Sequence, residues 1–119
     1  MRREEVYLAD LIEAADSIEF FLRNVERDAF LQDDLLRSPV LQKLTIIGEA
    51  AVRLPDEFHK RHPEIEWADI VGFRNIAVHS YFSIDWNIVW IAATRDAPTL
   101  REKIVKIIDG EYPSTDSQE

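Results

Sequence analysis

The chain has no cysteine, one methionine and only three glycines in 119 residues. Without cysteine it can form neither disulfides nor thiolate metal sites, and its composition does not call for an oxidising compartment. Charged residues interrupt the N-terminal segment, which therefore reads as neither a signal peptide nor a membrane span. These absences predict a cytoplasmic protein with no membrane segment.

Positive charge is also scarce. Lysine and arginine number 14 against 23 aspartate and glutamate residues, for a formal net charge of −9. Because affinity for nucleic acid depends heavily on cations that neutralise phosphates, this balance excludes non-specific RNA coating and favours a protein partner. An enzyme could still act on RNA if a few cations converge in one cleft.

The length fits one domain, expected to span residues 1–110 and to be followed by a polar tail at 111–119. The chain has few glycines, and its apolar residues recur three and four positions apart. This pattern predicts an all-α fold: an up-and-down bundle of four to five helices. The expected first helix runs from about Glu4 to Val25. A polar stretch at 27–37 follows, and then a helix with Ser38 as N-cap and Pro39 in its first turn, ending near Leu54.

Residues 55–63 are expected to hold one short helical turn. A third main helix should begin at 65–67 and end at 79–81, and Asp85 should cap a fourth. Because Pro98 lacks an amide donor and crowds the preceding turn, it should kink that fourth helix or begin a fifth.

The expected third helix places a charge in an apolar face. Arg74 falls in the middle of a face formed by Trp67, Ile70, Val71, Ala77, Val78 and Tyr81. Either its stem packs while its head reaches solvent, or it faces a cleft or a subunit interface. The opposite face, with Gly72, Asn75 and His79, is small-sided and should contact another helix.

Arg74 and His79 would lie about 140° apart on an ideal helix. One copy therefore does not focus both side chains on one phosphate unless the helix loosens before His79. Otherwise a second copy must complete the site. A lone helical histidine is also compatible with a purely structural role.

Three other groups of residues have two readings each. Glu49 either orients Arg74 or His79, or is a solvated helix position. The stretch 59–62 is dense in positive charge and either guides RNA or forms a solvent-facing turn. The tryptophans are core or dimer contacts, or could stack a base if exposed; they are Trp67, Trp86 and Trp90.

The segment RNIAVHSYF at 74–82 resembles the HEPN superfamily, and in particular its HepT-like toxin branch. That branch has Arg, four residues, His, one residue, Tyr, which Arg74, His79 and Tyr81 match without a gap. Asn75 is similar to the polar residue that commonly follows the arginine. The resemblance extends from LQKLTIIGEAAVRLP to IEWADIVGFRNIAVHSYFSIDWNIVW, with Ser83 where the branch often has glycine.

The resemblance implies a homodimer in which Arg74 and His79 of both subunits line one cleft, with Asn75 in support. It also implies RNA cleavage without metal or other cofactor. The expected partner is a minimal nucleotidyltransferase antitoxin of a type VII-like pair, which transfers AMP to Tyr81. Without the resemblance, the preferred interpretation of Tyr81 is a core aromatic with a bonded hydroxyl.

Two rival functions remain open at this point. One is a non-catalytic HEPN module that binds a nucleotide or partners a nucleotidyltransferase. The other is a helical adaptor in which Arg74 and His79 only bridge the dimer. The acidic net charge favours both rivals, whereas the intact Arg74 and His79 favour an endoribonuclease.

Overall fold

The computed structural model describes residues 2–76 and 83–112, and all its regular elements in these ranges are helical. The long helices are α1 (Arg2–Leu22), α3 (Asp34–Arg53) and α7 (Ala97–Glu111). Shorter helices are α2 (Arg27–Leu31), α4 (Asp56–Arg61), α5 (Trp67–Gly72) and α6 (Trp86–Ile91). The all-α bundle predicted from the sequence is confirmed.

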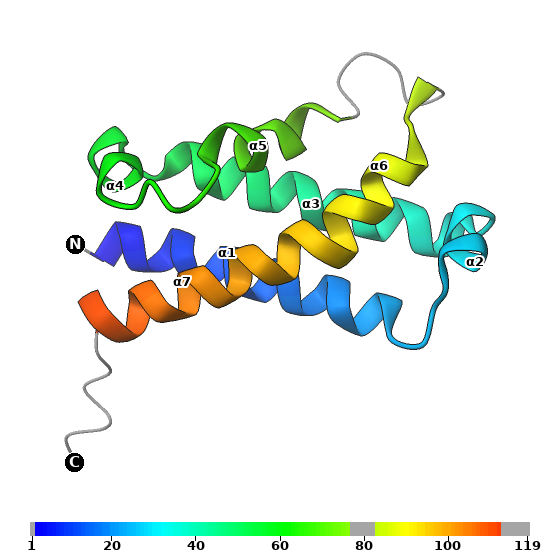
Figure 1. Cartoon of the computed structure of the whole chain (residues 1–119), viewed down its shortest axis with the longest axis horizontal. Coiled ribbons are helices and arrows are strands. Elements are labelled where there is room, and N and C mark those ends of the chain that lie inside the picture. Colours follow the sequence, from blue (N-terminus) through cyan, green and yellow to red (C-terminus); the bar gives the residue numbers. More distant parts are fainter. Residues whose placement is uncertain (1, 77–82, 113–119) are drawn as a thin grey trace.

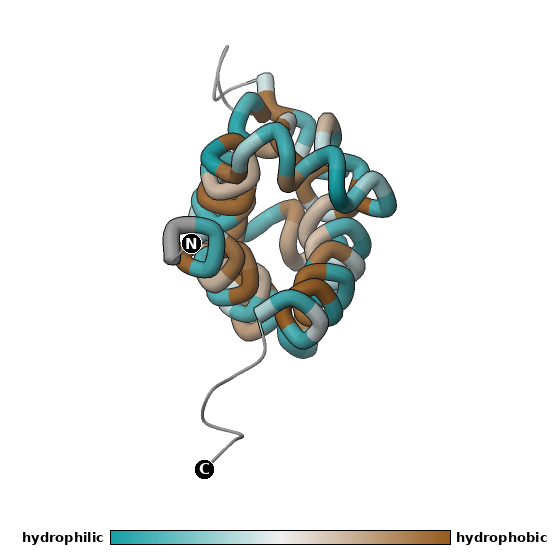
Figure 2. Tube along the Cα trace, turned by 90° about the vertical axis from the view of Figure 1, so that its left-hand side faces the viewer, coloured by the Kyte–Doolittle hydropathy of each residue, from teal (hydrophilic) through white to brown (hydrophobic). Residues whose placement is uncertain are grey.

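The helices pack side by side around one core, with α1 between α3 and α7 (Figure 1). Viewed along the bundle, hydrophobic stretches turn inward and hydrophilic ones outward (Figure 2). Buried aliphatic side chains of α1, α3 and α7 fill the centre, among them Leu8, Leu11, Ile18, Leu44, Ile47 and Ile104. None of the helices in the described ranges is long and apolar enough to cross a membrane.

The second main helix begins earlier than predicted. Its N-cap is Asp33, whose side chain accepts a hydrogen bond from Leu35 N at 2.9 Å. Pro39 therefore lies inside α3 and not in its first turn. The amide that Pro39 lacks would have bonded the carbonyl of Leu35, which lies at an exposed helix start where water can replace it.

The polar stretch at 27–37 also holds the short helix α2, which the sequence pattern did not predict. Its Phe30 is fully buried and packs against Trp86 and Trp90, with ring centroids at 6.4 and 5.3 Å. One large apolar side chain thus stabilises a segment too short and too polar to show helical periodicity. Trp86 and Trp90 are core contacts, as one of the two readings expected.

Pro98 begins a continuation of the fourth helix, as predicted. A π-helical turn, η3 (Ala92–Asp96), joins α6 to α7, and the three segments run as one curved helix (Figure 1). Because Pro98 sits at the start of α7, the wider turn before it removes the clash its ring would cause in a regular helix. Asp85 caps α6 by accepting a hydrogen bond from Asn87 N at 3.0 Å.

Candidate functional site

The third main helix loses α-helical geometry before the end of the predicted motif. After α5 ends at Gly72, a 3₁₀ turn, η1 (Phe73–Asn75), carries Arg74. The third main helix, expected from 65–67 to 79–81, is therefore wrong at Phe73–Asn75, and its expected end lies outside the described ranges. Phe73 is buried, and the stem of Arg74 packs on α3 while its head reaches solvent, which is one of the two expected readings. His79 and Tyr81, the other two motif residues, lie outside the described ranges.

Arg74 is half-exposed, and its stem lies against α3. The side chain keeps 39% of its surface accessible, and its Nε lies 3.3 Å from Glu49 Oε2, whose own side chain is 44% accessible. An ion pair this exposed adds little to stability, on the order of 0–1 kcal/mol. The ion pair instead orients the Arg74 side chain, because Glu49 holds the guanidinium at the surface.

Gly48 allows η1 to approach α3 at the point where Arg74 begins. A Cβ built on Gly48 would lie 2.6 Å from Arg74 N and 3.0 Å from Arg74 Cβ. No real Cβ tolerates the first distance, and the atom it meets is backbone, so any side chain at 48 would push η1 away. This role of Gly48 was not predicted from the sequence, although a glycine within a helical apolar stripe signals a close packing contact.

The other expected supporting residue, Asn75, follows Arg74 at the end of η1 and is exposed. Beyond it Ile76 is half-buried. Arg74, Asn75 and Glu49 thus share one exposed region, formed where η1 crosses α3. The structure brings together three of the predicted site residues there.

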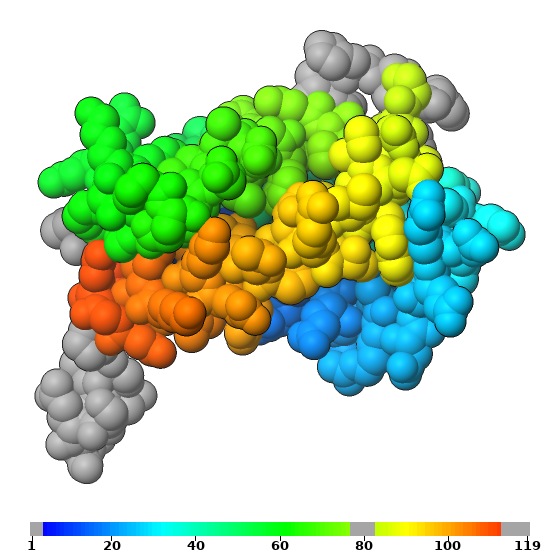
Figure 3. Space-filling model, in the orientation of Figure 1, coloured from blue at the N-terminus to red at the C-terminus, as the bar shows by residue number. Residues whose placement is uncertain are grey.

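The small-sided face of α5 is open to solvent within the single chain. Among the described residues, no atom lies within 4 Å of the position a Cβ of Gly72 would occupy, and Ala68 is exposed. A shallow groove of about 460 Å³ lies between this face and α6–η3. Ile88 and Ile91 line it, and Ile88 is 55% exposed. Figure 3 shows this side of the molecule, with α5 above the continuous α6–α7 helix.

A clamp at the start of α5 ties it to α3 and α4. His59 of α4 stacks on Trp67 with centroids 4.3 Å apart, and its Nε2 lies 2.8 Å from the carbonyl of Ala51 on α3. Because a carbonyl only accepts, Nε2 must carry the proton. Trp67 Nε1 in turn donates to the carbonyl of His62 at 2.9 Å. These contacts fix the helix that leads to Arg74.

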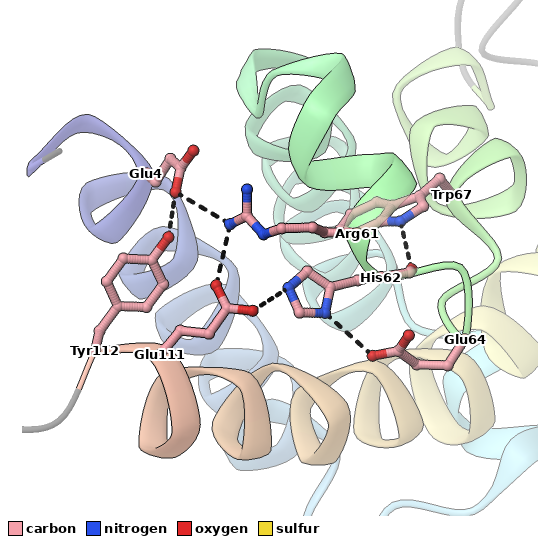
Figure 4. Close-up of polar contacts among 7 residues, drawn as sticks. All are labelled: Glu4, Arg61, His62, Glu64, Trp67, Glu111 and Tyr112. Carbon is pink, nitrogen blue, oxygen red and sulfur yellow. Dashed lines mark hydrogen bonds and ion pairs between the residues drawn. The ribbon is translucent and has the colours of Figure 1, made fainter.

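The positive stretch at 59–62 is not a simple solvent-facing turn. His62 is only 8% exposed, so that expectation is wrong for it. Its Nδ1 lies 3.3 Å from Glu64 Oε2, and its Nε2 lies 2.7 Å from Glu111 Oε2 without hydrogen-bond alignment (Figure 4). Arg61 donates to Glu111 at 3.0 Å and lies 3.7 Å from Glu4. Acidic partners therefore take up much of the charge proposed to guide RNA.

The same network reaches the first residues of the segment expected as a polar tail. The Tyr112 hydroxyl donates a hydrogen bond to Glu4 Oε1 (Figure 4). Burial, followed by this bond, raises the pKa of Tyr112 to about 12. The hydrogen bond to Glu111 raises the pKa of Arg61 above its usual value. The network therefore joins the start of α1, the end of α4 and the end of α7.

Within the described ranges, no three histidine, aspartate or glutamate side chains are grouped so that they could hold a metal ion. The arginine, asparagine and glutamate of the η1–α3 crossing provide hydrogen-bond donors and one carboxylate. The donors of Arg74 and Asn75 suit an anionic ligand such as a phosphodiester, whereas the Glu49 carboxylate opposes one.

Comparison with known proteins connects this arrangement to a family. Residues 11–107 match the family described as Ribonuclease HepT-like. A Thermococcus cleftensis protein named "Probable ribonuclease HepT" is 36% identical over 106 residues, which are 89% of this chain and 96% of that protein. A Methanocaldococcus jannaschii protein, named provisionally as an RNase, is 30% identical over 103 residues, 87% of this chain and 94% of its own length. No solved structure matches the chain.

Proposed function

Because this chain belongs to the HepT-like ribonuclease family, we propose that it is a metal-independent endoribonuclease and the toxin of a type VII-like toxin–antitoxin pair. In this proposal it works in the cytoplasm and cuts RNA with Arg74 and His79. The observation that carries the proposal is Arg74 itself. Its stem starts against Gly48, while its head is held at the surface by Glu49.

RNA supplies its own nucleophile, the 2′-hydroxyl. Cleavage then needs a base for that hydroxyl, an acid for the leaving 5′-oxygen and a positive group for the charge that builds on the phosphate. Arg74 fits the last task, because a guanidinium binds phosphate oxygens through paired hydrogen bonds. His79 fits either proton-transfer task, because imidazole titrates near neutral pH.

One histidine cannot be base and acid at once, so the proposal includes a homodimer in which each subunit contributes Arg74 and His79. The open face of α5 and α6 supports this arrangement. This face has small residues at Ala68 and Gly72 and apolar residues at Ile88 and Ile91, and it adjoins η1. A second copy that packed there would cover exposed apolar surface and bring two η1 turns close together.

Regulation by a nucleotidyltransferase partner forms the last part of the proposal. Transfer of AMP to Tyr81 would release pyrophosphate from ATP and leave a phosphodiester on the tyrosine oxygen. Tyr81 lies seven positions after Arg74 in the sequence. A negative phosphate near Arg74 would compete for the charge that holds RNA, and the adenosine would occupy space needed by substrate.

A non-catalytic module is the second candidate. The net charge of −9 favours it, and so does the carboxylate of Glu49 beside Arg74, since both weaken attraction for RNA. This candidate predicts a folded protein that binds its nucleotidyltransferase and leaves every RNA uncut.

Incubation of the purified protein with several RNAs in EDTA separates the candidates. We expect cleavage by the wild type, and a loss of about 10²–10⁴-fold in His79→Ala and Arg74→Ala. Arg23→Ala, which removes another exposed arginine at the far end of α1, should cleave normally. Full activity of His79→Ala, or strict dependence on Mg²⁺, would rule out the mechanism.

A further inference from the structure

A second groove lies between α1 and α7, and nothing in the proposed nuclease site uses it. Its volume is about 660 Å³, and its apolar lining includes Ile12, Phe20, Phe21 and Ile108. Phe20 is 66% exposed, and together with the other three residues it forms one apolar surface in the groove. Helix α1 therefore has a second apolar face besides the one in the core.

The charges along this groove have predominantly one sign. Glu13 and Asp16 line it, and the exposed Glu5 and Glu19 fall on the same side of α1 by helical spacing. Arg101 of α7 is bonded to Asp16, with its Nε 2.5 Å from Asp16 Oδ1. The guanidinium of Arg23 also lies over the Phe20 ring, 5.7 Å from its centroid. Two arginines therefore face four carboxylates, and the groove is apolar with a mainly acidic border.

This combination selects among possible occupants. RNA and anionic lipid surfaces would both be repelled by the carboxylates. A second copy meeting the same face about a twofold axis would bring two sets of these acids together, which costs energy. A basic segment with an apolar side satisfies both features, because its cations meet the acidic border while its apolar residues cover Phe20.

We propose that the α1–α7 groove is the docking site for a cationic amphipathic helix of a partner protein. The apolar side of that helix would pack on Ile12, Phe20 and Ile108, and its lysines or arginines would face Glu13 and Glu19. Arg74 lies elsewhere, on η1, which packs against α3. The occupant would therefore leave the RNA site open, and the proposal does not depend on nuclease activity.

A synthetic amphipathic helix built from leucine and lysine is a direct probe. Calorimetry should give a salt-sensitive affinity, and NMR shift changes should map to the backbone amides of α1 and α7. Phe20→Ser and Glu13→Lys should each weaken binding by about tenfold or more. Both positions are exposed, so circular dichroism should show that the variants keep their helices.

Two matched controls remove the same chemistry from other surfaces. Leu35→Ser changes another exposed apolar residue, and Glu57→Lys reverses another exposed acid. Both should bind the probe as the wild type does. Equal binding by Phe20→Ser, shift changes centred elsewhere, or no binding at all would overturn the proposal. So would self-association that Phe20→Ser abolishes, since the occupant would then be a second copy.

Discussion

At the scale of single residues, the position of Arg74 depends on a neighbour with no side chain. Gly48 lets the backbone of η1 lie against α3, and Glu49, the next residue, pairs with the guanidinium. Two consecutive positions of α3 therefore set where the arginine starts and where it points. This arrangement makes residue 48 as important to the site as the charged residues.

Gly48→Ala tests that dependence. Its Cβ would lie 2.6 Å from Arg74 N, so η1 must shift. We expect a loss of about 1–3 kcal/mol in the free energy of unfolding, as for other overpacked sites, and a fall in RNA cleavage. Urea denaturation and a cleavage assay measure both.

Gly110→Ala is the matched control for that substitution. Gly110 lies in α7, and no atom of the part of the chain that the structure describes comes within 4 Å of its Cβ position. Alanine there should stabilise the helix by roughly 0.5–1 kcal/mol. If Gly48→Ala behaves like Gly110→Ala, the close approach does not position Arg74.

Glu49→Gln separates orientation from stability. The Arg74–Glu49 pair is half-exposed, so the free energy of unfolding should change by less than about 1 kcal/mol. Loss of the carboxylate should leave the guanidinium less well held and lower kcat by about tenfold, while KM changes little. Steady-state kinetics measure kcat and KM for Glu49→Gln and for the control variant Glu57→Gln. An unchanged kcat would reduce Glu49 to a solvated helix position.

At the scale of elements, the network of Glu4, Arg61, His62, Glu111 and Tyr112 fastens three helix ends together. Because of Tyr112, the stability that this network contributes depends on pH in alkaline solution. The folded-state pKa of Tyr112 is raised to about 12 from an ordinary value near 10. A raised pKa means that its contribution is fully present below about pH 10 and is lost as the pH approaches 12.

Tyr112→Phe should therefore remove part of the fall in melting temperature between about pH 10 and 12. Near neutral pH it should cost about 1 kcal/mol for the lost hydrogen bond to Glu4. Thermal melts across this pH range, with Tyr7→Phe as the control, measure both effects. Identical pH profiles for Tyr112→Phe and the wild type would contradict the assigned role.

Much of the helical bundle could be predicted from the sequence, because long apolar stripes have a clear period. Three helix boundaries were also predicted from the sequence. They are the Asp85 cap, the end of the second main helix near Leu54 and the continuation after Pro98. The short helix α2 could not, because its burial depends on Phe30 meeting Trp86 and Trp90, which are distant in the chain.

The geometry around Arg74 could be predicted only in part. The expected helix placed Arg74 in an apolar face, and its stem does pack on α3, but the chain there forms a 3₁₀ turn that was not predicted. That turn depends on contact with α3 at Gly48, a tertiary effect with no local periodicity. His62 was misjudged for a similar reason, since its acidic partner Glu111 lies on another helix.

At the scale of the whole molecule, the open face of α5 and α6 is the proposed dimer interface. Ile88→Asp would bury a charge in that interface, so we expect the dissociation constant to rise by about two orders of magnitude and RNA cleavage to fall with it. Leu35→Asp places the same charge on an exposed residue at the start of α3 and should leave the dimer intact. Light scattering over a range of concentrations distinguishes these results. A wild type that stays monomeric at micromolar concentration would remove the shared cleft.

The most direct test of the central claim is the chemical identity of the ends that cleavage leaves. Mass spectrometry of a short RNA, cut by the wild type in EDTA, should find a 2′,3′-cyclic phosphate or its 3′-phosphate product on one fragment and a 5′-hydroxyl on the other. A substrate with deoxyribose at the cut position should stay whole. A 5′-phosphate with a 3′-hydroxyl would show that water attacks instead, and would contradict the roles proposed for Arg74 and His79.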